Sequence, residues 1–196
     1  MTMARRNLGL VAVASLLACV GCGSVAGAKF KLLVNRNNQE VVTDDKYAFR
    51  AGDQFRLQFT PVRSGYFYIV EKGSSGNYAM LFPRPELAGG ESWMSRRQWG
   101  REVLVPSKGW FVIDARPGVE TLYVCSAKRP ILPLERLMTV QTATPKDFEE
   151  ALQKTRETQP SDTINTKAYE LGWVILKSTS DWGRAVLVGD VTLRHE

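Results

Sequence analysis

The sequence predicts a mainly β protein, either an antiparallel β-sandwich or a barrel-like domain, with one amphipathic helix packed on it. Three observations lead to this fold class. Short runs are apolar on one or both faces with a period of two, turn residues separate these runs, and a helical pattern appears after residue 140. Short strands in this arrangement are typical of two stacked antiparallel sheets. We therefore expect a single β-rich domain over residues 30–196.

The first 18 residues have the organisation of a signal peptide. Arg5 and Arg6 provide a positive start, and residues 8–18 form an uncharged apolar stretch. A helix that crosses a bilayer needs roughly 20 apolar residues, so this stretch is too short to span a membrane. We therefore predict an exported protein whose residues 1–18 are removed.

The end of this leader resembles the lipobox of bacterial lipoproteins. The residues that carry the resemblance are Leu16, Leu17, Ala18 and Cys19. The resemblance implies cleavage before Cys19 and a covalent lipid of three acyl chains on that residue, which together anchor a protein stably to a bilayer. Val20, rather than aspartate, follows the cysteine, and by the sorting pattern of such lipoproteins this favours the outer membrane, facing the periplasm.

Alternatives stay open in this region. Cys22 is the other candidate for lipidation, and an ordinary cleaved secretory peptide would leave no lipid at all. Residues 24–29 are small, so we expect residues 19–29 to form a lipidated flexible tether. A disulfide between Cys22 and Cys125 is chemically allowed in an oxidising compartment, but Cys125 within TLYVCSA also fits a small buried strand residue.

The charge of the chain gives weak information about partners. Removing Arg5 and Arg6 with the leader lowers the formal net charge from +6 to +4. This mild excess permits attraction to anionic polymers of the envelope without requiring it, and export argues against nucleic acid as a partner.

The expected strands follow in chain order. Phe55, Leu57 and Phe59 alternate with polar residues, which predicts a half-buried strand over residues 54–60. Residues 65–72 are apolar on both faces, which favours a central strand. The glycine-rich turn at 73–77 then makes residues 78–83 its hairpin partner. Further strands are expected at 101–106, 110–115 and 120–127.

Several short motifs occur together in this part of the chain. They are Gly52-Asp53 before the alternating strand, GYFY at 65–68, the glycine-rich hairpin, LFP at 81–83 and PGVETLY at 117–123. Their order and spacing resemble the bacterial domain of unknown function family 4384 over residues 40–130. The resemblance implies an extracytoplasmic β-rich module without an established activity, and it supplies no catalytic residues.

The character of the sequence changes after residue 140. Thr144 as N-cap and an apolar stripe of Phe148, Ala151 and Leu152 predict a helix over residues 144–157. Residues 158–166 have the composition of a loop, and residues 168–194 return to strand patterning. The tail is either a second small domain or the last strands of the same β-structure. We favour the latter, because so short a tail makes a thin core alone.

The residue types that catalysis and metal binding need are scarce. His195 is the only histidine and stands second from the end, where chains usually fray. One histidine and one interior cysteine are too few for a zinc site. Asp114 and Glu120 could form a glycosidase pair, but any folded protein contains such pairs. We expect no enzyme, no metal and no cofactor other than the lipid.

Residues 89–102 form the candidate binding segment. Trp93 and Trp99 flank Arg96 and Arg97, and Arg101 follows. Indoles stack on sugar rings and guanidinium groups bind carboxylates or phosphates, so this segment could bind peptidoglycan, lipopolysaccharide or a partner protein. In the other interpretation the tryptophans pack inward over the sheet and the arginines are merely solvated.

Three functions remain open. We favour a membrane-anchored, non-catalytic protein-interaction module of the bacterial envelope, which predicts an exposed apolar patch or an open strand edge and no deep pocket. The second is an envelope glycan-binding lipoprotein that uses residues 89–102. The third is a hydrolase, which needs a cleft with two converging carboxylates or an ordered His195 in contact with a nucleophile.

Overall fold

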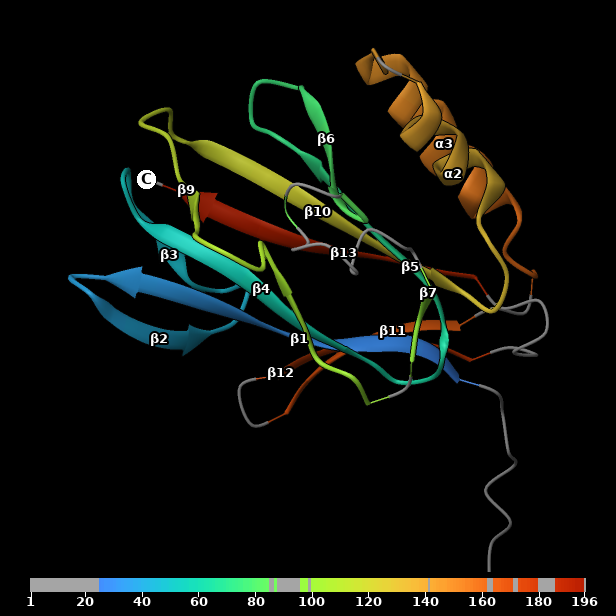
Figure 1. Cartoon of the computed structure of the whole chain (residues 1–196), viewed down its shortest axis with the longest axis horizontal. Coiled ribbons are helices and arrows are strands. Elements are labelled where there is room, and N and C mark those ends of the chain that lie inside the picture. Colours follow the sequence, from blue (N-terminus) through green and yellow to red (C-terminus); the bar gives the residue numbers. More distant parts are fainter. Residues whose placement is uncertain are drawn as a thin grey trace, which may run out of the picture.

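The described part of the protein consists of two stacked β-sheets with the helices α2 (Leu132–Thr139) and α3 (Pro145–Glu157) on one outer face (Figure 1). The computed structural model describes residues 25–84, 87, 96–98, 100–140, 142–161, 164–170, 173–179 and 186–195. Within these ranges the sheets remain open at their edges and do not close into a barrel. The prediction of a mainly β, sandwich-like domain is therefore confirmed.

The first sheet has seven strands, and every pairing in it is antiparallel. Its main path runs in the order β11 (Ile164–Glu170), β12 (Trp173–Thr179), β1 (Val25–Arg36), β4 (Gln54–Pro61) and β8 (Val103–Val105). Two short strands extend it: β2 (Gln39–Thr43) pairs with β1, and β9 (Phe111–Val112) pairs with β4.

The second sheet has six strands. Its main path runs in the order β3 (Ala48–Phe49), β13 (Val186–His195), β10 (Gly118–Ala127), β5 (Gly65–Lys72) and β6 (Tyr78–Phe82). The short strand β7 (Arg96–Arg97) also pairs with β5. The contact of β3 with β13 is parallel and the other pairings are antiparallel.

The main core lies between the two sheets. Each strand contributes every second residue, as the strand period requires. In β4 the predicted residues Phe55, Leu57 and Phe59 are all buried while their neighbours are half-buried, so the expected alternation is confirmed. From β13 opposite, Leu187 and Leu193 enter the same core.

A second, smaller core lies on the outer face of the six-stranded sheet, under the helices α2 (Leu132–Thr139) and α3 (Pro145–Glu157). Strand β5 contributes to both cores, with Phe67 and Ile69 on the inner side and Tyr68 and Val70 on the helical side. It pairs with β10 on one side and with β6 on the other. The prediction of a strand apolar on both faces is therefore confirmed.

The flexible tether expected at residues 19–29 is wrong for residues 25–29. Strand β1 begins at Val25, and Ala28 lies fully buried in the main core. The small residues serve close packing here. A Cβ on Gly27 would lie 2.1 Å from the carbonyl oxygen of Leu176, so only glycine lets β12 approach this closely.

Two further expectations need correction. Among the described residues, two helices rather than one pack on the sheet. Leu134 and Leu137 of α2 are buried there, but a segment of eight residues with Pro133 in its first turn gives too short a pattern to predict this helix. Strand β11 begins at Ile164, inside the segment 158–166 expected to be a loop, because pairing with β12 orders it. The predicted helix at 144–157 agrees with α3 and its N-cap Thr144.

Candidate functional site

Helix α2 is attached to the sheet through the buried hydroxyl of Tyr68. This hydroxyl donates a hydrogen bond to the Glu135 carboxylate at 2.5 Å and accepts one from the backbone N–H of Ile131 at 3.1 Å. Ile131 immediately precedes the helix, so the second bond fixes the point at which α2 begins. A residue at the centre of β5 therefore sets the position of α2 on the outer face of the sheet.

Helix α3 is positioned by its first turn. Thr144 and Asp147 form a capping box, in which each side chain accepts a hydrogen bond from the backbone N–H of the other residue. One turn later the ring of Phe148 stacks on Tyr78 of β6, with 5.7 Å between the ring centroids. The Tyr78 hydroxyl donates to Glu149 at 3.1 Å, so ring and hydroxyl both fix α3 over β6.

A groove of about 410 Å³ runs between the two helices on the side away from the sheet. We call it the helical groove and define it by its lining residues, which are Leu132, Pro133, Arg136, Leu137, Val140, Asp147, Glu150, Ala151 and Lys154. Leu132 is 64% exposed and Val140 is 49% exposed, whereas Leu137 and Ala151 are buried. The groove therefore combines an apolar floor with apolar side chains that no described residue covers.

Charges of both signs line the rim of the helical groove. Arg136 and Lys154 are basic and Asp147 and Glu150 are acidic. The Lys154 ammonium lies 3.7 Å from the Glu150 carboxylate, but both groups are exposed and the pair holds them only weakly. These side chains are therefore available to opposite charges on a partner.

The structure separates the arginines of the predicted binding segment 89–102. Arg96 and Arg101 are exposed, while Arg97 is buried. The Arg97 guanidinium lies 4.5 Å from the centre of the Phe82 ring and donates to the backbone oxygen of Arg96 at 2.7 Å. Burial, together with the charge of Arg101, lowers the pKa of Arg97 to about 10. Arg97 thus packs against the sheet, and Trp93 and Trp99 lie outside the described residues.

A cluster that the sequence analysis did not predict lies at one end of the main core. The strand register aligns Glu71 with Leu122 and His195 with Gly118, and Glu120 stands two residues before Leu122. Glu71, Glu120 and His195 therefore face inward, in line with core residues of their strands. Burial raises the pKa of Glu71 to about 7, and the charge of Glu120 and a hydrogen bond to it act in the same direction.

This cluster corrects the expectation that His195 lies at a frayed end. His195 is 4% exposed and belongs to β13, with its Nε2 atom 3.9 Å from the Glu120 carboxylate. A Cβ built on Gly118 would lie near both Ser74 Oγ and His195 Nε2, so a hydroxyl lies nearby. However, Glu120 faces the same Nε2 atom that would have to accept the serine proton. The groups therefore lack the relay geometry, in which acid and serine contact different ring nitrogens.

Other predicted features have simple outcomes. Cys125 is a buried free cysteine facing the helices, and burial raises the pKa of its thiol to about 12. Cys19 and Cys22 lie outside the described residues. In the part of the chain that the structure describes, there is no helix long and apolar enough to cross a membrane. The same residues contain no group of three histidines, cysteines or acids able to hold a metal ion.

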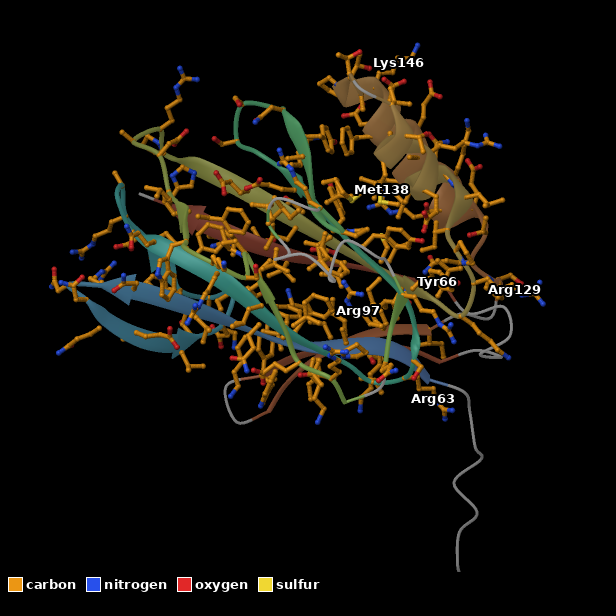
Figure 2. The ribbon with its side chains drawn as sticks, viewed as in Figure 1. Arg63, Tyr66, Arg97, Arg129, Met138 and Lys146 are labelled. Carbon is orange, nitrogen blue, oxygen red and sulfur yellow. The ribbon has the colours of Figure 1, made fainter. Side chains whose placement is uncertain are left out.

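The architecture defines the class of this protein: a two-sheet β-sandwich with a pair of helices packed on one outer face (Figure 2). Residues 48–130 match the family model described as Domain of unknown function (DUF4384), so this part of the chain is similar to that family. No curated protein and no solved structure matches the chain. The predicted family resemblance is therefore confirmed over β3 to β10, while β1, α2, α3 and β13 lie outside it.

Sequence reasoning missed the helical groove because it missed α2. The available signal was the pattern of Leu134 and Leu137 within residues 131–140, which places two apolar residues one turn apart. A helix of eight residues gives too short a pattern to separate from a loop that contains proline. The groove becomes recognisable only from the packing of α2 beside α3, because residues of both helices line it.

Proposed function

We propose that this protein is a non-catalytic protein-interaction module of the bacterial cell envelope and that the helical groove is its binding site. The exposure of Leu132 and Val140 over the apolar floor of the groove carries this proposal. Apolar surface that is exposed together and rimmed by charges is characteristic of sites that bind another protein.

The partner that fits this site is an amphipathic helix of another envelope protein. A helix lying in an apolar groove inserts residues spaced three and four apart, and the apolar residues that line the helical groove from α2 and α3 can receive them. Arg136 and Lys154 would meet acidic residues of that helix, and Asp147 and Glu150 would meet basic ones.

A photo-reactive amino acid at position 132 tests this site in living cells. We expect it to cross-link to one envelope protein, and we expect Val140→Asp to abolish that product because a carboxylate cannot be buried in an apolar contact. Position 119 is the matched control, since Val119 is 50% exposed on β10. Equal products from positions 132 and 119, or a product that survives Val140→Asp, would contradict the proposal.

We further propose that a lipid on Cys19 holds the protein in the outer membrane, facing the periplasm. The resemblance of residues 16–19 to a lipobox supports this location. Labelling cells with an alkyne-bearing fatty acid tests it: Cys19→Ser should remove the label from the protein and Cys22→Ser should keep it. The opposite pattern would assign the lipid to Cys22, and no label on the wild-type protein would contradict the anchor.

An envelope glycan is the alternative ligand, bound by the segment 89–102. The exposure of Arg96 and Arg101 favours this alternative. Pull-down of the protein with purified peptidoglycan or lipopolysaccharide tests this alternative. If the segment 89–102 binds the glycan, the double variant Arg96→Ala/Arg101→Ala should reduce the fraction of protein bound.

A further inference from the structure

The outer face of the seven-stranded sheet is basic where β1 begins. Phe30, Val174 and Leu176 enter the main core, so the residues between them on β1 and β12 face the opposite side. The register aligns Lys29 with Ile175 and Lys177 with Gly27, and Lys31 contacts the ring of Trp173. Lys29, Lys31, Lys177 and Trp173 therefore share one outer surface, which we call the basic face.

The side chains of the basic face are accessible and ordered. Lys29 and Lys177 are exposed, and Lys31 and Trp173 are half-buried. The Lys31 ammonium lies 4.1 Å from the centre of the Trp173 ring. This contact holds a cation and an indole together at the surface of the sheet.

Few acidic residues offset this charge. Neither β1 nor β12 contains an aspartate or a glutamate, and on the neighbouring strand β11 the register aligns one acidic residue, Glu170, with Trp173. The backbone N–H of Val62 donates to the Gly27 oxygen at 3.0 Å, and this bond brings the exposed Arg63 to the same end of β1. Glu102, which follows Arg101 in the chain, is an exposed acidic residue just before β8. The start of β1 is therefore surrounded by an excess of positive charge.

We propose that the basic face lies on the anionic head groups of the bilayer that holds the lipid anchor, an inference that rests on the proposed lipid at Cys19. Cys19 precedes Val25 by six residues, which span roughly 20 Å when extended. The domain is then kept close to the membrane at the end where its cations gather. Lysine side chains extend their ammonium groups to phosphates, and tryptophan favours the membrane–water interface.

This orientation explains how the anchored protein keeps its binding site free. The helices lie on the outer face of the six-stranded sheet, and the basic face lies on the outer face of the other sheet. Figure 2 shows Lys146 on α3 and Arg63 on opposite sides of the molecule. With the basic face against the bilayer, the helical groove points away from the membrane.

Lysine protection on vesicles tests the orientation. The purified acylated protein is inserted into vesicles of phosphatidylcholine, with or without roughly 30% phosphatidylglycerol. An amine-reactive reagent then labels exposed lysines, which are read by mass spectrometry. We expect labelling of Lys29 and Lys177, relative to Lys146 of the same molecule, to fall about threefold on the anionic vesicles. It should recover at roughly 0.5 M salt, which screens the attraction.

Paired charge reversals provide the control. The double variant Lys29→Glu/Lys177→Glu should remove the protection of Lys31 from labelling. The control double variant Lys128→Glu/Lys146→Glu changes the net charge by the same amount and should keep the protection of Lys31. Suppose that the protein floats with the anionic vesicles but Lys29, Lys177 and Lys146 are labelled equally. This result would overturn the proposed orientation and leave the proposed lipid anchor intact. A protein that does not float with either vesicle overturns both proposals. Protection by soluble polygalacturonate and not by vesicles would make the face a glycan site and overturn the inference.

Discussion

Glu71 and Glu120 form a hydrogen-bonded pair of carboxyl groups inside the β-sandwich, on the neighbouring strands β5 and β10. Two carboxylates in contact cannot both ionise without strong repulsion, so one of them keeps its proton. Burial raises the pKa of Glu71 first, and the charge of Glu120 raises it further, to about 7. His195 faces the pair from β13, so the pair and the histidine together close this end of the core.

This pair should make the protein less stable as the pH rises. The pKa of Glu71 is about 7 in the folded protein against an ordinary value of 4.5, so between these values the folded state binds more protons than the unfolded state. The free energy of unfolding therefore falls across this window, by at most about 1.4 kcal/mol per pH unit. Urea unfolding measured between about pH 5 and pH 8 checks this slope.

Glu71→Gln isolates the effect of the pair. Glutamine keeps a donor for Glu120 and removes the titration, so the unfolding free energy of this variant should stay nearly constant over the same pH range. Glu102→Gln removes an exposed carboxylate and should leave the wild-type slope unchanged. A wild-type slope near zero, or an equally steep slope in Glu71→Gln, would show that Glu71 titrates normally.

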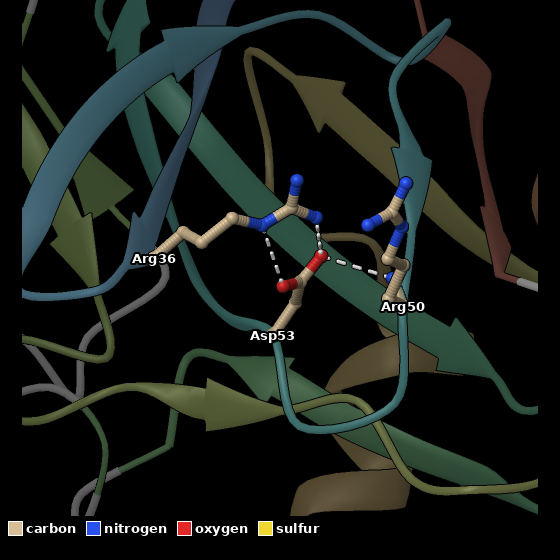
Figure 3. A network of polar contacts seen from close by, with 3 residues as sticks. All are labelled: Arg36, Arg50 and Asp53. Atoms are coloured by element: carbon tan, nitrogen blue, oxygen red, sulfur yellow. Dashed lines mark hydrogen bonds and ion pairs between the residues drawn. The ribbon is translucent and has the colours of Figure 1, made fainter.

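Asp53 joins the end of β1 to the turn before β4, and its removal should destabilise the fold. Its carboxylate accepts hydrogen bonds from the Arg36 Nε at 3.1 Å, the Arg36 Nη2 at 2.5 Å and the Arg50 backbone N–H at 2.9 Å (Figure 3). Burial opposes ionisation of Asp53, but the bonds from Arg36 and Arg50 outweigh it and lower the pKa of the carboxyl group. We expect Asp53→Asn to reduce the unfolding free energy by about 1–3 kcal/mol at neutral pH.

The stabilisation by Asp53 should also depend on pH. Because its pKa is lowered on folding, this contribution is present above the ordinary value of 3.8 and is lost as the pH falls through the folded value.

Glu40→Gln is the comparison for Asp53→Asn. Glu40 pairs with Arg56 at 2.5 Å but is exposed, so this variant should cost less than about 0.5 kcal/mol of unfolding free energy. Equal losses of unfolding free energy in Asp53→Asn and Glu40→Gln would show that the burial of Asp53 does not strengthen its contribution to stability.

Cys125 should be unreactive in the folded protein. It is fully buried beneath the helices, and burial raises the pKa of its thiol to about 12, so almost no thiolate forms at neutral pH. In a Cys22→Ser variant of the lipidated protein, a thiol reagent should label Cys125 in urea and not in buffer. Labelling in buffer at the rate seen in urea would mean that the helices leave the sheet freely.

The capping box of α3 should contribute to the stability of the helical groove. Thr144→Ala removes the hydroxyl that accepts the Asp147 backbone N–H, and we expect a loss of about 1 kcal/mol in urea unfolding. Thr142→Ala, at an exposed position before the helix, should stay within about 0.5 kcal/mol of the wild type. Equal unfolding free energies for Thr144→Ala and Thr142→Ala would show that the capping box does not contribute to stability.

Several features of the fold follow from patterns of neighbouring residues. Alternation in residues 54–60 specified the inner face of β4, and the apolar run 65–72 specified a strand buried on both faces. Thr144 and Asp147 marked the start of α3, because a helix end must satisfy its own free N–H groups. These signals act within a few residues, so they are readable from the chain alone.

The tertiary structure decided what depends on partners distant in sequence. Pairing with β12 and β4 orders residues 25–29, and pairing with β13 orders His195. The register of β5 against β10 brings Glu71 to Glu120 across about fifty residues of chain. The helical groove exists because the sheet holds α2 beside α3. In each case the stabilising contact is made by strands or helices far apart along the chain, and no local pattern encodes which of them will meet.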